Sequence, residues 1–396
     1  MRITFLMPGY SSAPSGGFRV VYEYANRLVS RGHRVVVVQP RRLKFAPASE
    51  PLTAKRRIRD SLKNGLKMLR SKTAINWQPV DPRVELLLVP HSGSRYMPDA
   101  DVIFATSWHT VQSILECPEA KGEKCYFIQG YESYHAAKDL VDDTWRAPLH
   151  KIVIAKWLVG LGTELGCGEL TYIPNAINHD LYRLTQPIEG RSRQVSMLFS
   201  TTQIKGSADG IEALKIIREN YAAVKVVFFG VSRPQSWIPE WVEYHRNPPQ
   251  DFLINEIYNK SSVYLAPSWT EGSPLPPAEA AACGCAVVAT NIGGFREYIE
   301  DGVTGLLSPP QEPTGLAENI GLLLGNEPLR VRLAKACNSY IASLSWERSA
   351  DLFEDFLEDV TSDRSVDLQG VVYPESATKV ESMRRKEEVL GLKTDK

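Results

Sequence analysis

Residues 264–300, which give the clearest indication of the fold, read YLAPSWTEGSPLPPAEAAACGCAVVATNIGGFREYIE. An apolar run that ends at Ala266 predicts a short buried strand, and a turn-rich segment with Gly272 and several prolines follows it. Small residues over 278–283 predict a helix, whose start tolerates proline because the N–H there is unsatisfied anyway. A second strand is predicted at 286–290. Strand, loop, helix and strand in this order are typical of a parallel α/β sheet.

Two carboxylates frame the loop of this unit. Glu271 lies in the loop itself, and Glu279 lies eight residues further on, near the start of the predicted helix. Ligands of open α/β sheets bind beyond the carboxyl ends of the strands, so this loop is expected to line a binding site. Its amides and the helix N-terminus would favour an anion there. The alternative for an isolated pair is that Glu279 only interacts with its own helix dipole while Glu271 is solvated.

The segment EGSPLPPAEAAACGCAVVATNIGGFREYI closely resembles the signature of GT-B glycosyltransferases of family 4, also called group 1. That signature has an E-x7-E motif, a small-residue helix with A-C-G, an apolar strand and a Gly-Gly-x-x-E turn, and weaker similarity extends over most of residues 1–360. The resemblance implies an α/β GT-B fold with two Rossmann-like domains facing a central cleft and a C-terminal helix that crosses back to the N-terminal domain. We expect the N-terminal, acceptor-side domain over 1–185, completed by a helix at about 346–361. A nucleotide-sugar-binding domain is expected over 186–345, followed by a flexible tail at 362–396.

Composition narrows the class of protein. The 396 residues suffice for two to three domains, and 46 basic residues balance 46 acidic ones, so no net field favours nucleic acid. The six cysteines form no CxxC pair, which fits a reduced setting. The chain shows neither an apolar run of about 20 residues nor the layout of a signal peptide. We therefore predict a cytoplasmic protein, at most peripheral at the inner face of a membrane.

The N-terminal half opens with a strand at 3–7, a loop that contains Gly16 and Gly17, and a helix over 18–31. This is Rossmann-like, but it lacks G-x-G-x-x-G, which disfavours a dinucleotide-dependent dehydrogenase. The two glycines would let the backbone approach a phosphate or sugar closely, or they form a plain turn. Resemblance favours the first role, because family 4 enzymes have a Gly-Gly loop here that faces donor and acceptor.

A basic segment interrupts the α/β rhythm at residues 55–72. It contains eight basic residues against the single acid Asp60, and its apolar residues share one helix face. A basic amphipathic helix predicts contact with an anionic membrane surface or with a lipid-linked anionic acceptor. The alternative is a solvated helix that covers the N-terminal sheet.

Polar residues follow two later strands of this half. His109 comes after the strand at 102–106 and is either a general base or a hydrogen-bonding partner of a sugar, although a lone histidine is more often structural. After the strand at 126–129 many family members carry a histidine that touches the donor sugar. This chain has Gln129 instead, which keeps hydrogen bonding but lacks a titrating group. The formal DxD at 99–101 directly precedes a buried strand and predicts a turn, so we expect no metal.

The C-terminal half begins with a strand at 195–200, followed by a Lys205-Gly206 pair that matches the family. The arginine that family members usually carry five or six residues earlier is absent, and Phe199 and Ser200 occupy its place. A hydroxyl does not replace the five donors of a guanidinium at equal strength. The neutral hydrogen-bonding side chains that remain in the loop are Ser200, Thr201 and Thr202. Further on, the candidates for the walls of a nucleobase pocket, with ordinary aromatic packing as the alternative, are Trp237, Trp241, Tyr244, Arg246 and Asn247.

The resemblance assigns roles to these residues. Lys205 and the loop Gly272, Ser273, Pro274 and Leu275 would stabilise the leaving diphosphate without a metal. Glu271 would contact donor-sugar hydroxyls near the reacting carbon, and Glu279 the two ribose hydroxyls. The implied function is retaining transfer of a hexosyl or deoxyhexosyl group from a nucleotide sugar to a glycan or lipid-linked saccharide, in cell-surface polysaccharide synthesis. The missing arginine keeps a second hypothesis open: a non-catalytic GT-B subunit that binds a nucleotide sugar or a partner enzyme.

Overall fold

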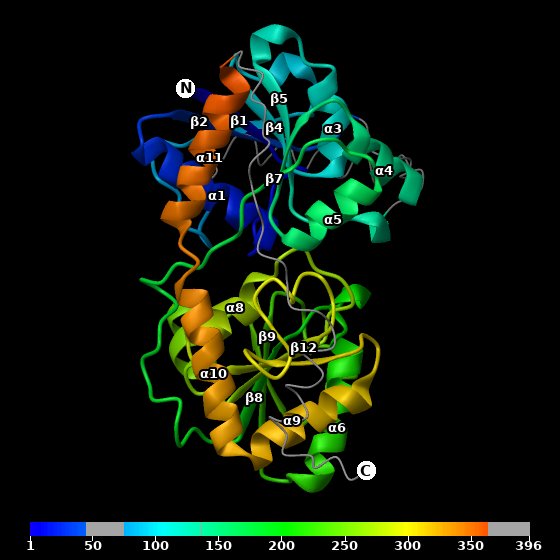
Figure 1. Ribbon diagram of the computed structural model, residues 1–396, viewed down its shortest axis with the longest axis vertical. Helices are drawn as coiled ribbons and strands as arrows, with labels where there is room; N and C mark the ends of the chain where they lie inside the picture. The colour runs from blue at the N-terminus through cyan, green and yellow to red at the C-terminus, as the bar shows by residue number, and fades with distance from the viewer. Residues whose placement is uncertain (45–74, 136, 363–396) are drawn as a thin grey trace, which may run out of the picture. The chain divides into compact units, whose positions relative to one another are not determined.

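The structure, a computed structural model, describes residues 1–44, 75–135 and 137–362. The chain forms two compact units (Figure 1). The N-terminal unit comprises 1–153, 159–172 and 350–362, and the C-terminal unit comprises 154–158 and 173–349. The predicted segment 55–72 and nearly all of the predicted tail lie outside the described residues.

Residues 173–185 belong to the C-terminal unit, although they were predicted to lie in the N-terminal domain. Their contacts explain the assignment. The Asn175 side chain donates to the carbonyl oxygen of Ser273 (3.3 Å), and the Tyr182 ring packs 6.4 Å from that of Tyr258. Both partners lie in the C-terminal unit.

The N-terminal unit is built on a seven-stranded parallel sheet in the order β3-β2-β1-β4-β5-β6-β7. Its strands are β1 (Arg2–Leu6), β2 (Arg34–Pro40), β3 (Glu85–Val89), β4 (Val102–Ala105), β5 (Glu123–Ile128), β6 (His150–Val153) and β7 (Thr171–Tyr172). Its helices are α1 (Gly16–Ser30), α3 (Trp108–Leu115), α4 (Lys138–Arg146), most of α5 (Lys156–Glu164) and most of α11 (Trp346–Thr361). The order of the strands reverses between β1 and β4, which makes their carboxyl ends a topological switch point.

Helix α11 is bound into this unit although it ends the described chain (Figure 1). Phe353 places its ring 6.1 Å from Phe5, 5.3 Å from Phe104 and 5.9 Å from Phe127, on three neighbouring strands. Glu354, next along the helix, accepts hydrogen bonds from Arg31 and from His33 (2.8 Å). Burial alone would raise the pKa of Glu354, but these hydrogen bonds outweigh it and hold the pKa below its ordinary value.

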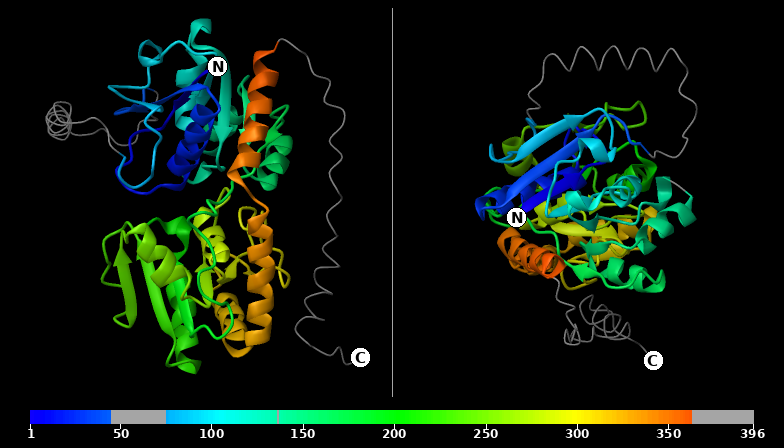
Figure 2. Two further views of the ribbon diagram at one scale, coloured as in Figure 1. Left: turned by 90° about the vertical axis from the view of Figure 1, so that its left-hand side faces the viewer. Right: turned by 90° about the horizontal axis from the view of Figure 1, so that it is seen from above.

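The C-terminal unit is built on a six-stranded parallel sheet in the order β10-β9-β8-β11-β12-β13. Its strands are β8 (Gln194–Leu198), β9 (Lys225–Gly230), β10 (Val242–Arg246), β11 (Val263–Ala266), β12 (Ala286–Thr290) and β13 (Leu306–Ser308). The main helices are α6 (Ser207–Asn220), α8 (Leu275–Ala282), α9 (Pro313–Gly325) and α10 (Glu327–Ala342). The strand, helix and strand predicted within 264–300 are β11, α8 and β12. Figure 2 shows the strands of each unit flanked by helices.

The core of the C-terminal unit positions its loops. The strands β9, β11 and β12 are mostly apolar and buried, as expected for a parallel sheet covered on both faces, whereas the edge strand β10 is polar and only partly buried. Helix α8 carries alanine at four of its eight positions, and the small side chains let its backbone approach β11 and β12 closely. The loop that precedes α8 is therefore held at the carboxyl edge of the sheet. Among the described helices, we find no segment with the length and hydropathy that a bilayer-spanning helix requires.

Candidate functional site

In the C-terminal unit the strand order reverses between β8 and β11, which are neighbours in the sheet. The loop 199–206 leaves the carboxyl end of β8, and the loop 267–274 leaves the carboxyl end of β11. Lys205 lies on the first loop and Glu271 on the second. The topology thus brings both residues to the switch point, where open α/β sheets bind their ligands.

The two side chains form an ion pair. Lys205 Nζ lies 2.7 Å from Oε1 and 2.9 Å from Oε2 of Glu271, and Ser268 Oγ donates to the same Oε1 at 2.9 Å. The Lys205 side chain is 31% exposed and that of Glu271 is 14% exposed, so water screens the pair only partly. An ammonium has three N–H donors, and two of them face the carboxylate. The third can serve an anionic ligand at this edge.

Two glycines let the backbone pack around this pair. Gly206 has a left-handed conformation with φ +62°, and a Cβ there would lie 2.0 Å from the carbonyl oxygen of Pro267. Gly294, in the predicted Gly-Gly turn, packs against Glu271, since a Cβ would lie 2.5 Å from the Glu271 carbonyl oxygen. A side chain at either position would push the loops apart. The close approach of backbones therefore sets the distance between Lys205 and Glu271.

Side-chain donors anchor three carbonyl groups of the loop that precedes α8. Trp157 Nε1 donates to the Gly272 oxygen at 2.7 Å, Asn175 Nδ2 to the Ser273 oxygen at 3.3 Å, and the Tyr298 hydroxyl to the Pro274 oxygen at 2.9 Å. In a trans peptide the N–H points opposite to the carbonyl group. The N–H groups of Ser273 and Leu275, which follow the carbonyls of Gly272 and Pro274, therefore point away from these side-chain donors. The start of α8 thus presents fixed donors, as an anion site requires.

Glu279 lies on α8 and is only 3% exposed. The Tyr258 hydroxyl donates to Glu279 Oε2 at 3.2 Å. Burial raises the pKa of Tyr258 well above its ordinary value, and the charge of Glu279 adds to this effect. The charges of Glu279 and Glu271 both contribute to the raised pKa of buried Tyr264 and buried Tyr298. The two carboxylates of the E-x7-E motif are therefore electrostatic neighbours of the same two phenols.

Phe199, at the place of the missing arginine, points into the core. It is 1% exposed, and its ring lies 6.2 Å from Phe228, 5.5 Å from Tyr244 and 5.1 Å from Trp237. The side chain of this position is thus part of an aromatic cluster, and Trp237, which is 45% exposed, is its solvent-facing member. Of the other base-pocket candidates, Trp241 packs under the guanidinium of Arg218, 4.7 Å from the ring centroid.

The hydroxyl residues of the same loop lie at its surface. Ser200 is half-buried, and its Oγ accepts a hydrogen bond from the backbone N–H of Thr202 at 3.1 Å. Thr201 and Thr202 are exposed, and Thr201 Oγ1 lies 3.5 Å from Ser232 Oγ. These residues lie on the loop that carries Lys205, and the backbone N–H of Lys205 donates to the carbonyl oxygen of Thr202 at 3.0 Å. Their expected role toward a diphosphate stays a prediction.

The N-terminal unit has its own switch point between β1 and β4. Gly16 and Gly17 begin α1, which follows the loop after β1. A Cβ on Gly17 would lie 3.4 Å from Gln129 Oε1, so the glycine pair and the glutamine after β5 are neighbours. Gln129 Oε1 is buried, and none of the described residues donates a hydrogen bond to it. A buried acceptor without a donor costs about 1–3 kcal/mol.

His109 lies on the first turn of α3 at the same edge. Its Nδ1 lies 3.1 Å from Ser107 Oγ, and Ser107 Oγ donates to Glu132 Oε2 at 3.0 Å. No role was predicted for Ser107 or Glu132 from the sequence. The only available signal was their position, directly after two neighbouring strands of the sheet.

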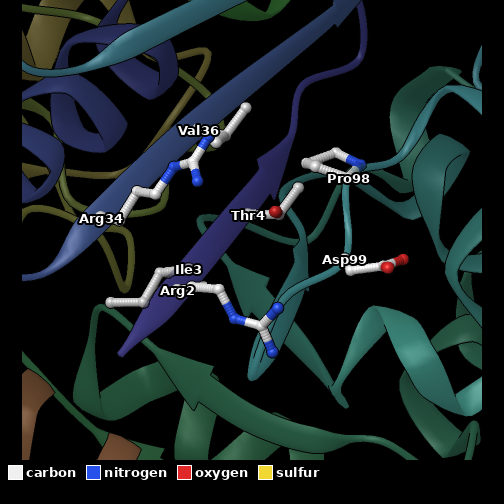
Figure 3. A pocket seen from close by; sticks show the side chains of 7 residues that line it. All are labelled: Arg2, Ile3, Thr4, Arg34, Val36, Pro98 and Asp99. Atoms are coloured by element: carbon white, nitrogen blue, oxygen red, sulfur yellow. The ribbon is translucent and has the colours of Figure 1, made fainter.

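The DxD acids and the cavity beside them lie at the opposite, amino edge of this sheet. The cavity has a volume of about 260 Å³. Figure 3 shows Arg2, Arg34 and Asp99 among the side chains that line it. Asp99 pairs with Lys121 (2.8 Å), and Asp101 pairs with Arg2 (2.6 Å), which lowers the pKa of both carboxyls. Among residues 1–44, 75–135 and 137–362 no group of three or more His, Cys, Asp or Glu side chains is arranged to hold a metal.

Comparison with known proteins gives two findings, the first from sequence. Residues 195–326 match the family model described as glycosyl transferases group 1. D-inositol 3-phosphate glycosyltransferase of Corynebacterium jeikeium is 31% identical over 113 residues, which are 28% of this chain and 26% of that protein. The enzyme of the same name from Corynebacterium urealyticum is 36% identical over 103 residues, 26% of this chain and 24% of that protein. The matched part thus spans about a quarter of the length of these curated relatives.

The second finding comes from solved structures. Anabaena HepE, solved in complex with UDP-glucose, has a TM-score of 0.68 at 15% identity and covers 91% of this chain and 100% of its own. S. aureus TarM has a TM-score of 0.70 at 10% identity, and the match covers 90% of this chain and 99% of TarM. Sucrose-phosphate synthase from Thermosynechococcus elongatus has a TM-score of 0.66 at 16% identity, and the match covers 91% of this chain and 98% of the synthase chain. The chain has the GT-B fold. The predicted fold class is therefore confirmed.

Proposed function

We propose that the chain is a retaining glycosyltransferase that moves a hexosyl or deoxyhexosyl group from a nucleotide-sugar donor to a glycan or lipid-linked saccharide. The observation that carries this proposal is the Lys205–Glu271 pair at the switch point of the C-terminal unit. The pair lies inside the segment that matches group 1 glycosyl transferases. The UDP-glucose complex of HepE, a protein of the same fold, supports a nucleotide sugar as the donor.

The leaving group explains why these residues are placed together. Cleavage of the bond between the anomeric carbon and the diphosphate oxygen leaves negative charge on the diphosphate. We assign its stabilisation to the ammonium of Lys205, to the fixed N–H groups of Ser273 and Leu275, and to the N-terminus of α8. These donors are held by the anchored loop before the reaction begins, so little reorganisation opposes the developing charge. In this proposal the protein's own donors stabilise that charge without a metal.

The two carboxylates receive different roles. Glu271 orients Lys205 and would contact sugar hydroxyls near the reacting carbon, where its charge favours an oxocarbenium-like transition state. Glu279 would accept hydrogen bonds from the ribose hydroxyls, because a carboxylate can accept from two neighbouring hydroxyls. Its near-complete burial beside Tyr258 means that only a small part of the carboxylate would meet the nucleotide.

Further residues to which the resemblance gives a role lie in the N-terminal unit. We assign Gly16 and Gly17 to close approach of donor or acceptor, and Gln129 and His109 to sugar hydroxyls. A ligand hydroxyl would satisfy Gln129 once its amide turns toward the ligand, which the buried and unmet Oε1 favours. Synthesis of a cell-surface polysaccharide, at the cytoplasmic face of a membrane, is the setting that we propose for this reaction.

The test separates the two carboxylates. Glu271→Ala is expected to abolish sugar transfer while it keeps affinity for a nucleoside diphosphate. Glu279→Gln, which retains the size of the buried side chain, is expected to weaken that affinity about tenfold to hundredfold, as the loss of one hydrogen bond to a charged group would. Titration calorimetry with UDP and with GDP measures the affinities, and a thermal-shift screen of nucleotide sugars selects the donor for the transfer assay.

Glu256→Gln is a matched control, because this exposed carboxylate of the same unit pairs with Lys260 on the surface. It should change neither transfer nor affinity. Equal nucleoside diphosphate affinities for the Glu271 and Glu279 variants would contradict the assignment of their roles.

One observation favours a second candidate function, a non-catalytic subunit that binds a nucleotide sugar. Phe199 is buried in an aromatic cluster at the place where family members carry an arginine, so one cationic group expected on the diphosphate is absent there. Such a subunit would bind the donor but leave it intact. Slow hydrolysis of a nucleotide sugar by the purified wild-type chain, lost in Glu271→Ala, would exclude this candidate.

A further inference from the structure

Trp269 connects the two loops that carry Lys205 and Glu271. Its backbone N–H donates to the carbonyl oxygen of Ile204, the residue before Lys205, at 2.7 Å. Its indole Nε1–H donates to Asp209 Oδ2 at 2.5 Å. An indole N–H can only donate, so the direction of this bond is fixed whatever the charge of its partner. A single residue of the Glu271 loop thus holds the chain on both sides of Lys205.

The acceptor of the indole bond belongs to a helix. Asp209 lies in the first turn of α6, where the helix dipole stabilises a negative charge. A hydrogen bond to a charged acceptor is stronger than one between neutral groups. The indole bond therefore fastens Trp269 to a regular element of the C-terminal unit rather than to another loop.

The residue before Trp269 holds the same loop to the sheet. The Thr290 hydroxyl, at the end of β12, donates to the carbonyl oxygen of Ser268, and the Ser268 hydroxyl donates to Glu271 Oε1 at 2.9 Å. The carboxylate is thus positioned from β12, whereas the loop of Lys205 is positioned from Trp269. The lysine side chain is a flexible four-carbon chain, so the place of its ammonium depends on where its backbone is held.

We propose that Trp269 and Asp209 are positioning residues whose hydrogen bond keeps the loop of Lys205 against the loop of Glu271, so that the ammonium is held where a diphosphate binds. That the ammonium meets a diphosphate rests on the proposed function, whereas the positioning of the ion pair does not. The competing interpretation is that Trp269, which is half-buried, makes only apolar contacts. Only the proposal requires the indole N–H and an acceptor at position 209.

The ion pair reports its own positioning without any ligand. Trp269→Phe removes the N–H and keeps an aromatic ring, and Lys205→Met removes the ammonium. Chemical unfolding of the wild type, the two single variants and the double variant measures the coupling between these changes. We expect Lys205→Met to destabilise the Trp269→Phe chain clearly less than the wild type, because the pair is already displaced in that chain. If Trp269 only packs, Lys205→Met destabilises both chains equally.

Variants of Asp209 separate the hydrogen bond from the charge. Asp209→Asn keeps an acceptor oxygen in a side chain of the same shape, whereas Asp209→Leu keeps a similar size and removes every acceptor. Calorimetric titration with UDP and with GDP is expected to show an affinity loss of about threefold to tenfold in Trp269→Phe and in Asp209→Leu, as for one lost hydrogen bond. The affinity of Asp209→Asn should stay within about twofold of the wild type, because the bond to the indole is retained.

Trp77→Phe is the matched control. Trp77 Nε1 donates to the carbonyl oxygen of Ser11 at 3.2 Å, and both residues belong to the N-terminal unit. This variant loses an indole hydrogen bond of the same kind in the unit to which we assign no diphosphate contact from Lys205 or α8. It should leave the affinity for UDP and GDP unchanged.

NMR of the indole N–H groups checks the bond in solution. The chain has eight tryptophans, and Trp269→Phe identifies the signal by its loss. We expect this proton to be shifted downfield and protected from exchange with water in the wild type and in Asp209→Asn, and to lose both features in Asp209→Leu. A signal that is the same in Asp209→Leu as in the wild type would show that Asp209 is not the acceptor.

The outcomes separate this inference from the proposed function. Equal effects of Lys205→Met in the two chains, or an affinity loss in Asp209→Asn as large as that in Asp209→Leu, overturn the inference even if the chain transfers sugar. Coupling in the unfolding experiment, together with unchanged UDP and GDP affinity in every variant including Lys205→Met, supports the positioning of the ion pair and contradicts the proposed function.

Discussion

Replacing Lys205 by methionine is expected to affect both the stability of the C-terminal unit and its affinity for a diphosphate. Methionine keeps an unbranched apolar side chain, so the change removes the ammonium with little loss of packing. It leaves Glu271, whose side chain is 14% exposed, with the hydrogen bond from Ser268. The largely buried carboxylate of Glu271 then has no ammonium to balance its negative charge.

The magnitude follows from the exposure of the two side chains. Exposed ion pairs contribute about 0–1 kcal/mol, while breaking a fully buried pair costs about 3–5 kcal/mol. With side chains 31% and 14% exposed, the Lys205–Glu271 pair lies between these limits. We expect Lys205→Met to lower the free energy of unfolding by about 1–3 kcal/mol. The double variant Lys205→Met/Glu271→Gln should be more stable than Lys205→Met alone, because it leaves no carboxylate without its cation.

The assay combines chemical unfolding of the four proteins of this cycle with calorimetric titration of UDP and GDP. Lys205→Met should weaken the binding of the preferred diphosphate by tenfold or more. A hydrogen bond to a charged group contributes about 1.5–3 kcal/mol, and the loss of one such bond corresponds to this change in affinity. Glu271→Gln should keep or increase that affinity, because the ammonium no longer has a competing carboxylate.

Two results would refute this reasoning. The first is a double variant whose destabilisation equals the sum of the two single ones, since the pair would then have no coupling energy. The second is a loss of diphosphate affinity in Glu271→Gln as large as that in Lys205→Met. In that case the carboxylate itself would contribute to diphosphate binding, and the division of roles between the two residues would be wrong.

Two further predictions concern a turn and a pH dependence. Gly206→Ala should lower the melting temperature clearly more than Gly190→Ala does. Both glycines have φ above +60°, but a Cβ at Gly206 would lie 2.0 Å from the Pro267 carbonyl oxygen, whereas a Cβ at Gly190 would meet nothing within 4 Å. Equal losses in thermal melts would contradict the role of close packing at Gly206. Glu354→Gln should destabilise the N-terminal unit at neutral pH, because the lowered folded-state pKa of Glu354 stabilises the fold above the ordinary pKa of 4.5. That difference from wild type should shrink as the pH falls through the lowered pKa, and a difference constant down to the acid transition would exclude the carboxylate as its source.

Much of the site was accessible from local patterns in the sequence. The E-x7-E spacing placed Glu271 in a loop and Glu279 on a helix, and the structure has the helix at 275–282. The Lys-Gly pair predicted a turn, and Gly206 has the left-handed conformation for which glycine is suited. These features depend on residues within a few positions of one another, so composition and spacing are sufficient to predict them.

Local sequence patterns are therefore sufficient to specify the alternation of parallel strands and helices, the turns, and the residue types at the strand ends. Which loops meet depends on the folded chain. Lys205 and Glu271 are 66 residues apart, and Ser107 and Glu132 are 25 apart. They meet because β8 pairs with β11 and β4 with β5, and strand order depends on packing between distant segments. The inward direction of Phe199 has the same origin, since only the folded sheet defines which side of its strand is the core.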